Sequence, residues 1–230
     1  MKTISNFFDG KLITSESTDK LPLYKPTTGE EYAQIPVTTD KEFKLIIDKM
    51  KNAQISWANT PVTKRSAILF KFKRLIEKNF DEIARVISEE HGKVFSDAKG
   101  SLQRGLEVVD FACGIPHLLK GNHSINVGTN VDLFDIKQPL GICAGITPFN
   151  FPAMVPMWMF PMAIACGNTF VLKPSEKDPS CSMKLAQLFS EAGLPDGVLN
   201  VVNGDKEVVD AILENKGISA VSFVGSTPIA

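Results

Sequence analysis

The sequence is poor in the residues from which metal centres and hydrolytic sites are built. Its 230 residues include only four cysteines and three histidines, and no two cysteines have Cys-x-x-Cys spacing. We therefore expect no metal site and no Ser/His/Asp constellation. The cysteines lie in apolar or loop contexts, so they are expected to be reduced core residues of a cytoplasmic protein.

An excess of one charge and a targeting segment are also lacking. The chain has 25 basic and 26 acidic side chains, a net charge of −1. This balance gives no reason to expect nucleic acid or an anionic membrane as a partner. The first residues contain neither an apolar secretory core nor an Arg-rich amphipathic leader, so no signal or transit peptide is expected.

The most informative absence is that of charge from Pro139 to Leu172, a stretch of 34 residues. An apolar run of this length is either a membrane span or the centre of a large core. It contains five prolines, each of which removes a backbone donor that hydrocarbon could not replace, and this favours the core. Asn150 lies between two phenylalanines in this run, so we expect its carboxamide to need a polar partner.

Residues 1–121 are predicted to form a hairpin followed by helices. Asp9-Gly10 between apolar residues is a hairpin signal, and Thr39 to Glu42 is a capping box. Further helices are predicted from Pro61, from about Asp81 to Gly92, and over residues 96–113. Residues 122–138 alternate loosely between apolar and polar side chains, which predicts a small two-stranded excursion.

From residue 139 onward the pattern alternates between strands and helices. Strands are expected over 141–146, 169–172, 198–202 and 218–223, separated by helices over 152–166, 180–192 and 205–214. This alternation predicts an α/β fold with a doubly wound, Rossmann-like parallel sheet. In such sheets ligands bind at the carboxyl ends of the strands, so residues 139–230 are the expected nucleotide-binding part.

Three loops follow strands at that edge. One carries Asn150, the second carries Lys173 and Glu176, and the third is the small-residue turn Gly225-Ser226-Thr227. A Lys and a Glu here could bind ribose hydroxyls, and the carboxylate favours NAD over NADP; a solvated charged turn is the alternative. The third loop could bind phosphate at a helix N-terminus or be an ordinary loop, since no Gly-x-Gly-x-x-Gly or Walker motif is present.

Arg104 lies on the predicted helix over residues 96–113. Leu102, Leu106, Val109 and Cys113 form one apolar stripe of that helix, and Val108 and Phe111 form a second stripe in line with Arg104. An arginine on an inward-packing stripe needs an anion. The alternatives are a surface arginine whose stem lies on apolar groups and an internal ion pair.

Taken together, these motifs resemble the NAD(P)-dependent aldehyde dehydrogenase superfamily. The resemblance covers nearly the whole chain and rests on four segments in order: Pro148 to Pro152, Gly167 to Glu176, Ala192 to Asn200, and Phe223 to Thr227. It implies oxidation of an aldehyde through a cysteine thiohemiacetal, with hydride transfer to NAD. It also implies that residues 122–138 are oligomerisation strands, so that the complete protein would be a homodimer or homotetramer.

The resemblance assigns roles by position. Asn150 matches the catalytic asparagine that stabilises the oxyanion, and Lys173 and Glu176 match the ribose-binding pair. Ser226 matches the phosphate contact. The remaining residues that match the cofactor cleft are Ile146, Thr147, Pro148, Phe149, Ser175 and Gly225.

Within the family, residues 146–161 look most like the branch of methylmalonate- and malonate-semialdehyde dehydrogenases, in which coenzyme A receives the acyl group. The substrate of that branch carries a carboxylate, for which Arg104 would be a suitable bidentate partner. Family members run to roughly twice this length, so we expect the chain to be an amino-terminal part that lacks the catalytic cysteine. The alternatives are an aldehyde dehydrogenase that releases a free acid and a non-catalytic nucleotide-binding module.

Overall fold

The charge-free run forms a buried strand, helix and strand. In the computed structural model, which describes residues 2–227, these are β8 (Ile142–Ile146), α6 (Met154–Ala165) and β9 (Thr169–Lys173). Every residue of both strands is buried, as are nine of the twelve residues of α6. The prediction of a core is thereby confirmed. Within residues 2–227 no helix combines the length and the apolar character needed to cross a membrane.

The main sheet has six strands in the order β11-β8-β9-β10-β2-β3. Strands β11 (Ile218–Phe223), β8, β9 and β10 (Leu199–Val201) are parallel, which confirms the predicted sheet. The hairpin of β2 (Asn6–Phe8) and β3 (Lys11–Ile13) continues the sheet in antiparallel fashion. The first residues of the chain therefore lie beside a strand that is almost 200 residues away in sequence.

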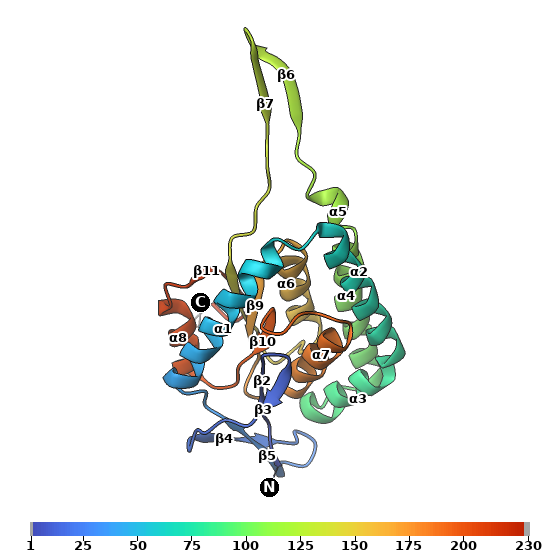
Figure 1. Cartoon of the computed structure of the whole chain (residues 1–230). Coiled ribbons are helices and arrows are strands. Elements are labelled where there is room, and N and C mark those ends of the chain that lie inside the picture. The colour runs from blue at the N-terminus through green and yellow to red at the C-terminus, as the bar shows by residue number, and fades with distance from the viewer. Residues whose placement is uncertain (1, 228–230) are drawn as a thin grey trace.

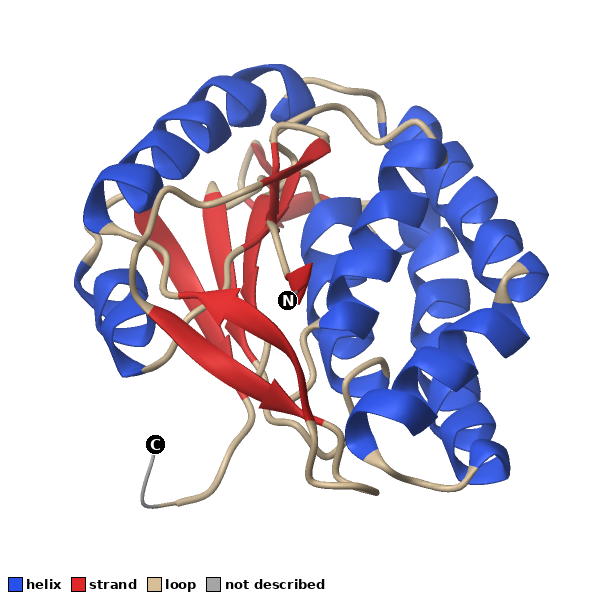
Figure 2. Ribbon diagram, turned by 90° about the horizontal axis from the view of Figure 1, so that it is seen from below, coloured by secondary structure: helices blue, strands red, loops and turns tan. Residues whose placement is uncertain are grey.

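Helices cover both faces of this sheet (Figure 2). Ile142, Ala144 and Val171 share one core cluster with residues of α1 (Asp40–Ala58) and α8 (Lys206–Glu214). Alternate strand residues, among them Cys143 and Phe170, join the larger cluster on the opposite face. The helices of that face are α6, α2 (Val62–Lys78), α3 (Phe80–His91), α4 (Phe95–Cys113) and α7 (Ser180–Glu191). Two covered faces explain why β8 and β9 carry no polar stripe.

Local signals in the N-terminal part form the predicted structures. Asp9 and Gly10 have φ values of 53° and 76°, as the two central residues of a tight hairpin require. Thr39 Oγ1 accepts from the Glu42 backbone N–H at 3.3 Å, and a Glu42 carboxylate oxygen accepts from the Thr39 N–H at 2.9 Å. Gly92 ends α3 with a φ of 86°, a left-handed conformation that glycine adopts without strain.

Other elements were not predicted. A second sheet has the order β1-β5-β4 and consists of β1 (Lys2–Thr3), β4 (Lys20–Tyr24) and β5 (Glu31–Pro36). Pro22 lies in β4, an edge strand, where a missing backbone donor is tolerated. A short helix, α5 (Ile115–Leu118), follows α4.

The predicted excursion is a two-stranded projection, here called the arm (residues 122–138). It contains β6 (His123–Gly128) and β7 (Val131–Phe134) and extends far from the body (Figure 1). All ten residues of the two strands are exposed. The arm therefore takes no part in the core of this chain.

Candidate functional site

Strand register brings the three predicted loops to one edge of the sheet. Ile146, the last residue of β8, pairs with Lys173 of β9 on one side and with Phe223 of β11 on the other. Backbone hydrogen bonds extend this register into the loops, from Thr147 N–H to the Lys173 carbonyl at 3.2 Å and from Val224 N–H to the Ile146 carbonyl at 3.1 Å. The loops that follow these strands therefore begin side by side.

Lys173 and Glu176 form an ion pair at this edge. The Lys173 ammonium donates to Glu176 Oε2 at 3.2 Å, with its side chain 6% exposed and that of Glu176 40% exposed. The Ser175 side chain is buried, and its Oγ accepts from the Lys177 N–H at 3.1 Å. A solvated charged turn does not bury its lysine. The geometry instead holds Lys173 in place and leaves the carboxylate of Glu176 accessible.

The loop with Asn150 differs from its prediction in one respect, because Asn150 is exposed rather than enclosed by apolar groups. Its backbone carbonyl accepts a hydrogen bond from Lys93 Nζ at 2.9 Å. Its carboxamide makes no hydrogen bond within residues 2–227. The reason is position: the loop lies beyond the ends of the strands, where α6 and the sheet no longer cover it.

Phe149 lies close to the side chains of Lys177 and His91. The ammonium of Lys177 is 4.6 Å from the ring centroid, and the ring of His91 is 6.2 Å away. The phenylalanine itself is 45% exposed. Ile146 and Thr147 are buried and Pro148 is partly buried. The buried hydroxyl of Thr147 has no hydrogen-bond partner in the described part of the chain.

Gly225 and Ser226 are exposed and follow β11. A Cβ at position 225 would lie 2.4 Å from the ring of Phe223, so any other residue there would have to displace that ring. The helix expected after this turn lies outside the described residues.

Arg104 lies at the surface, which is one of the three alternatives that the sequence left open. The first stripe of α4 is buried, but Arg104 is exposed and Phe111 of the second stripe is 59% exposed. A helix that packs on α2, α3 and α6 through one side buries only that side. Arg104 forms no ion pair with any residue between 2 and 227.

None of the four cysteines lies in the loops at this edge. Cys113, Cys143 and Cys181 are buried, and Cys166 is partly buried. Burial raises the pKa of the Cys113 thiol to about 11 and also raises the pKa of the other three thiols. These cysteines are thiols rather than thiolates at neutral pH, and a nucleophile requires the thiolate.

A cavity of about 520 Å³ adjoins Phe149 and Glu176. It is also lined by β4, by the end of α3 and by Asp178. The Glu90 carboxylate accepts from the Tyr32 hydroxyl and from the N–H and hydroxyl of Ser180, both at 2.7 Å. Both Asp178 oxygens are buried and accept no hydrogen bond from residues 2–227. Burial, and next the Glu90 carboxylate, raise the pKa of Asp178 to about 9.

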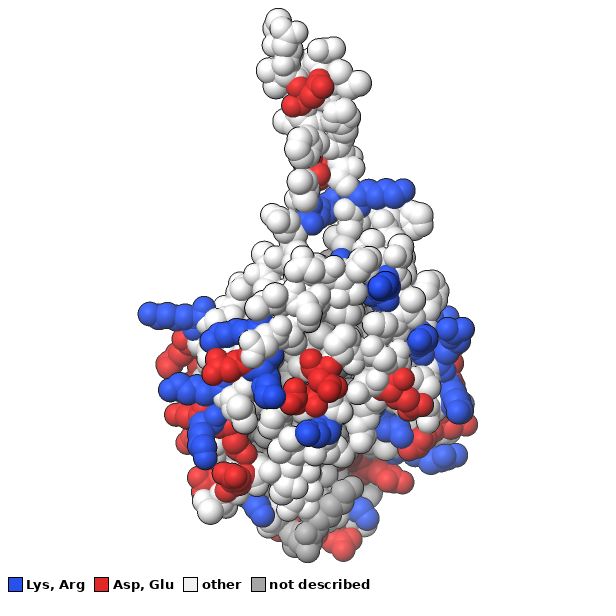
Figure 3. All heavy atoms as spheres, viewed as in Figure 1, with Lys and Arg blue, Asp and Glu red and all other residues white. Residues whose placement is uncertain are grey.

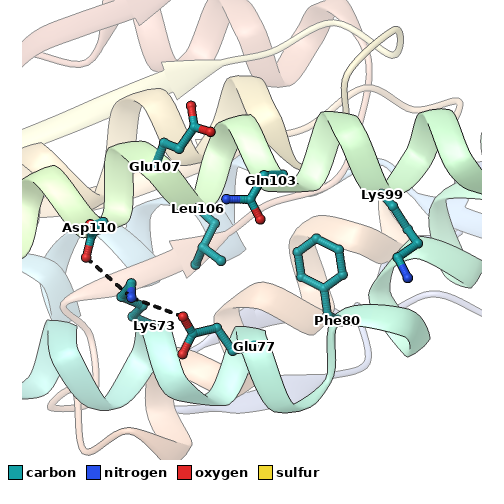
Figure 4. A pocket seen from close by; sticks show the side chains of 8 residues that line it. All are labelled: Lys73, Glu77, Phe80, Lys99, Gln103, Leu106, Glu107 and Asp110. Carbon is teal, nitrogen blue, oxygen red and sulfur yellow. Dashed lines mark ion pairs between the residues drawn. The ribbon is translucent and has the colours of Figure 1, made fainter.

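A second cavity, of about 430 Å³, lies between α2, α3 and α4 (Figure 4). Lys73 stands between Glu77 and Asp110 there, at 3.0 and 3.4 Å. None of the loops at the sheet edge lines this cavity. Lys73, Glu77 and Asp110 pair with one another, and the cavity is separate from the loops, so we assign it no part in the candidate site.

Sequence reasoning found the three loops but missed several residues that lie around them. Lys93, Glu90, His91 and Asp178 are the main ones. Lys93 follows the glycine that ends α3, and nothing in that local pattern indicates a contact with residue 150. Within residues 2–227, no group of three or more His, Cys, Asp or Glu side chains could hold a metal ion.

Comparisons with known proteins agree on one family. The profile of the aldehyde dehydrogenase family matches residues 12–230. The chain is 51% identical over 230 residues to malonate-semialdehyde dehydrogenase of Pseudomonas aeruginosa, and the match covers 46% of that protein. It is 50% identical to the mitochondrial methylmalonate-semialdehyde dehydrogenase [acylating] of Arabidopsis thaliana, over 97% of the chain and 37% of the relative.

Solved structures give the same result. One is a protein of Sinorhizobium meliloti 1021 that is assigned to the methylmalonate-semialdehyde dehydrogenases and was solved with NAD. It superposes with a TM-score of 0.98 at 50% identity, over all of this chain and 47% of that chain. The chain thus spans about half the length of these relatives or less.

Proposed function

The chain belongs to the aldehyde dehydrogenase family, and from that premise we propose that it is the coenzyme-binding part of an NAD-dependent, CoA-acylating semialdehyde dehydrogenase. One observation carries the proposal: the register of Ile146 with Lys173 and Phe223, which gathers three loops at one sheet edge. The names of the Pseudomonas and Arabidopsis relatives support the substrate class.

NAD would bind across that edge. Lys173 and Glu176 would hydrogen-bond its ribose hydroxyls, and the Glu176 carboxylate would disfavour the extra phosphate of NADP. The exposed turn at Gly225 and Ser226 would hold phosphate through backbone N–H groups. The walls and floor of the cleft would be formed by Ile146, Thr147, Pro148, Phe149 and Ser175.

NAD supplies the chemistry of a hydride acceptor when it is bound. Asn150 would donate a hydrogen bond from its carboxamide to the oxyanion that forms when a thiolate adds to the aldehyde carbonyl. Its lack of any other hydrogen-bond partner in the described chain leaves that donor available. Such a donor, held in place in advance, commonly lowers the barrier by about 3 to 4 kcal/mol.

The thiolate itself would come from outside these 230 residues. The four cysteines are thiols packed away from the Asn150 loop, with raised pKa values. We therefore do not expect the 230-residue chain by itself to turn over aldehyde.

The acyl group would pass to coenzyme A, as the word acylating in the name of the Arabidopsis relative supports. With methylmalonate or malonate semialdehyde, NAD and coenzyme A as reactants, the products would be propanoyl-CoA or acetyl-CoA, CO2 and NADH. Arg104, exposed and without an ion pair among the described residues, would bind the substrate carboxylate.

The complete protein would be a homodimer or homotetramer assembled through the arm. The exposed apolar side chains of the arm support this role. The four free cysteines support a cytoplasmic location. We propose neither nucleic acid nor a membrane as a partner.

The function is tested by expressing the chain together with any coding sequence that continues it. NADH formation from malonate semialdehyde should require coenzyme A, and mass spectrometry should detect acetyl-CoA. Asn150→Ala should lower kcat about 10²- to 10³-fold. A free acid formed without coenzyme A would favour the other type of aldehyde dehydrogenase. Saturable NAD binding without any NADH formation would favour a non-catalytic module.

Arg104 has its own test in the same assay. Arg104→Leu should lower kcat/KM for malonate semialdehyde at least tenfold more than for propanal, because only the first substrate has a carboxylate. Gln103→Leu, one position earlier on α4, serves as the control and should lower neither. Equal losses on both substrates would remove Arg104 from the substrate site.

A further inference from the structure

The side chain of Lys93 is buried, which is unusual for a lysine. It lies in the short link between α3 and α4, and its side chain is only 7% exposed. Its nearest carboxylate, on Asp97, is 3.8 Å away, and the Asp97 side chain is 54% exposed. A buried ammonium needs closer partners than this distant ion pair.

Those partners belong to the Asn150 loop. Lys93 Nζ donates to the Asn150 carbonyl at 2.9 Å and lies 4.5 Å from the ring centroid of Phe151. Both are favourable contacts for a buried cation. No other side chain donates a hydrogen bond to the Asn150 carbonyl within the described chain, and the Asn150 carboxamide itself is unbonded there.

The consequence is geometric. Lys93 holds the backbone carbonyl of Asn150, the residue that also carries the carboxamide. It also contacts the ring of the next residue, Phe151. With the carbonyl of residue 150 and the ring of residue 151 both held, the direction of the carboxamide between them is restricted. His91, two residues before Lys93, also contacts Phe149 on the other side of Asn150.

We propose that Lys93 is a positioning residue for the reaction, which holds the backbone of the Asn150 loop so that the carboxamide is aimed at the developing oxyanion. This rests on the proposed function of Asn150. Lys93 touches neither substrate nor coenzyme in this role, and acts only through Asn150. A lysine that merely stabilised the fold would affect every property of the protein together.

The first test uses the 230-residue chain and needs no activity. Lys93→Met keeps the apolar stem and removes the ammonium. We expect it to shift the NMR resonances of the Asn150 side-chain amide, whereas Lys93→Arg should keep them close to their original positions. Unchanged Asn150 resonances in folded Lys93→Met would overturn the proposal.

Lys99→Met is the matched control. Lys99 also lies over aromatic rings, those of Phe80 and Phe95 at 5.8 and 5.5 Å, and pairs with Asp81 at 2.9 Å. It makes no contact with the Asn150 loop and is 42% exposed. This variant should leave the Asn150 amide resonances unchanged. If Lys93→Met does not fold, Lys93→Gln replaces it.

The second test is a kinetic double-mutant cycle in the chain with any coding sequence that continues it. Lys93→Met should lower kcat for the semialdehyde 10- to 100-fold with less than a twofold change in the Kd for NAD. In the Asn150→Ala background the same substitution should change kcat less than twofold. Equal losses in both backgrounds would overturn the proposal.

The two tests separate this inference from the function on which it rests. If the unsubstituted enzyme oxidises no aldehyde, the proposed function fails, and the NMR result alone decides whether Lys93 holds Asn150. If the enzyme is active but the cycle is additive, the function stands and the positioning role fails.

Discussion

The arm and the charge-free run that follows it are adjacent in sequence, but the arm is exposed and the run is buried. Ile125, Phe134 and Ile136 of the arm are 69%, 68% and 72% exposed, whereas Phe160 and Phe170 of the run are each 1% exposed. Helices pack over both faces of β8 and β9, but nothing in the described chain packs over β6 and β7. Apolar side chains are therefore buried only where elements of the same chain cover them, and those of the arm require another surface.

The arm and the charge-free run differ little in charge but strongly in what packs around them. The run has no charged residue from Pro139 to Leu172, and the arm has few (Figure 3). Acidic and basic groups are spread over the body on the same view. Low charge alone thus does not show whether a segment forms a core or an interface. Substitutions in buried and exposed positions distinguish the two.

The largest effect is expected from a matched pair of phenylalanines. Phe160→Ala in α6 should lower the free energy of unfolding by about 3 to 5 kcal/mol, because a fully buried ring leaves a cavity. Phe134→Ala in the arm should change it by less than about 0.5 kcal/mol. Urea denaturation of dilute protein measures both. Similar losses would mean that the arm packs on the body in solution.

Asp178 is a buried carboxyl group, so it tests how burial affects an acidic side chain. An unfolded aspartate has a pKa of about 3.9, and the folded pKa is about 9. Unfolding between these values releases a proton, so the stability contributed by this group is full below pH 4 and is lost as pH rises towards 9.

Asp178→Asn should therefore make stability less dependent on pH. Between pH 5 and 8 the variant should gain up to about 1.4 kcal/mol per pH unit relative to the original chain. Thermal or urea unfolding across that range measures the difference. Asp132→Asn, which removes an exposed acid from the arm, is the control. Parallel stability curves for Asp178→Asn and the original chain would contradict the raised pKa.

Self-association tests whether the exposed apolar side chains of the arm form an interface. Phe134→Ser should weaken the dimer or tetramer at least tenfold, or about 1.4 kcal/mol, because it removes an apolar group from the proposed interface. Sedimentation equilibrium measures the change. Leu213→Ser on α8, which is also exposed at 59%, should have no effect. If both substitutions weaken association equally, the arm is not the specific contact.

The parts of the fold that could be predicted are those set by neighbouring residues. The Asp9-Gly10 turn, the Thr39 cap and the Gly92 helix end each depend on a few adjacent side chains, and all three form as expected. The sheet followed from buried runs of strand length. Strand β4 was missed because Pro22 and two nearby lysines hide its pattern.

The site was predictable to the same degree. The three loops could be found because each follows a strand, and parallel strands end at one edge. The exposure of Asn150 was not predicted, and that of Arg104 was one of three open alternatives, because exposure depends on which elements fail to cover a residue. Lys93 and Asp178 were missed because the groups that they interact with, Asn150 and the like-charged Glu90, lie 57 and 88 residues away in sequence.

The affinity for NAD tests the central claim most directly, which is that the edge formed by β8, β9 and β11 is the coenzyme site. Lys173→Met removes one proposed ribose partner and the ion pair with Glu176. Calorimetric titration of the chain with any coding sequence that continues it should give saturable NAD binding, weakened at least tenfold in Lys173→Met. Lys184→Met, which removes an ion pair on α7, should bind as the original does. NAD binding of equal strength in Lys173→Met would contradict the claim.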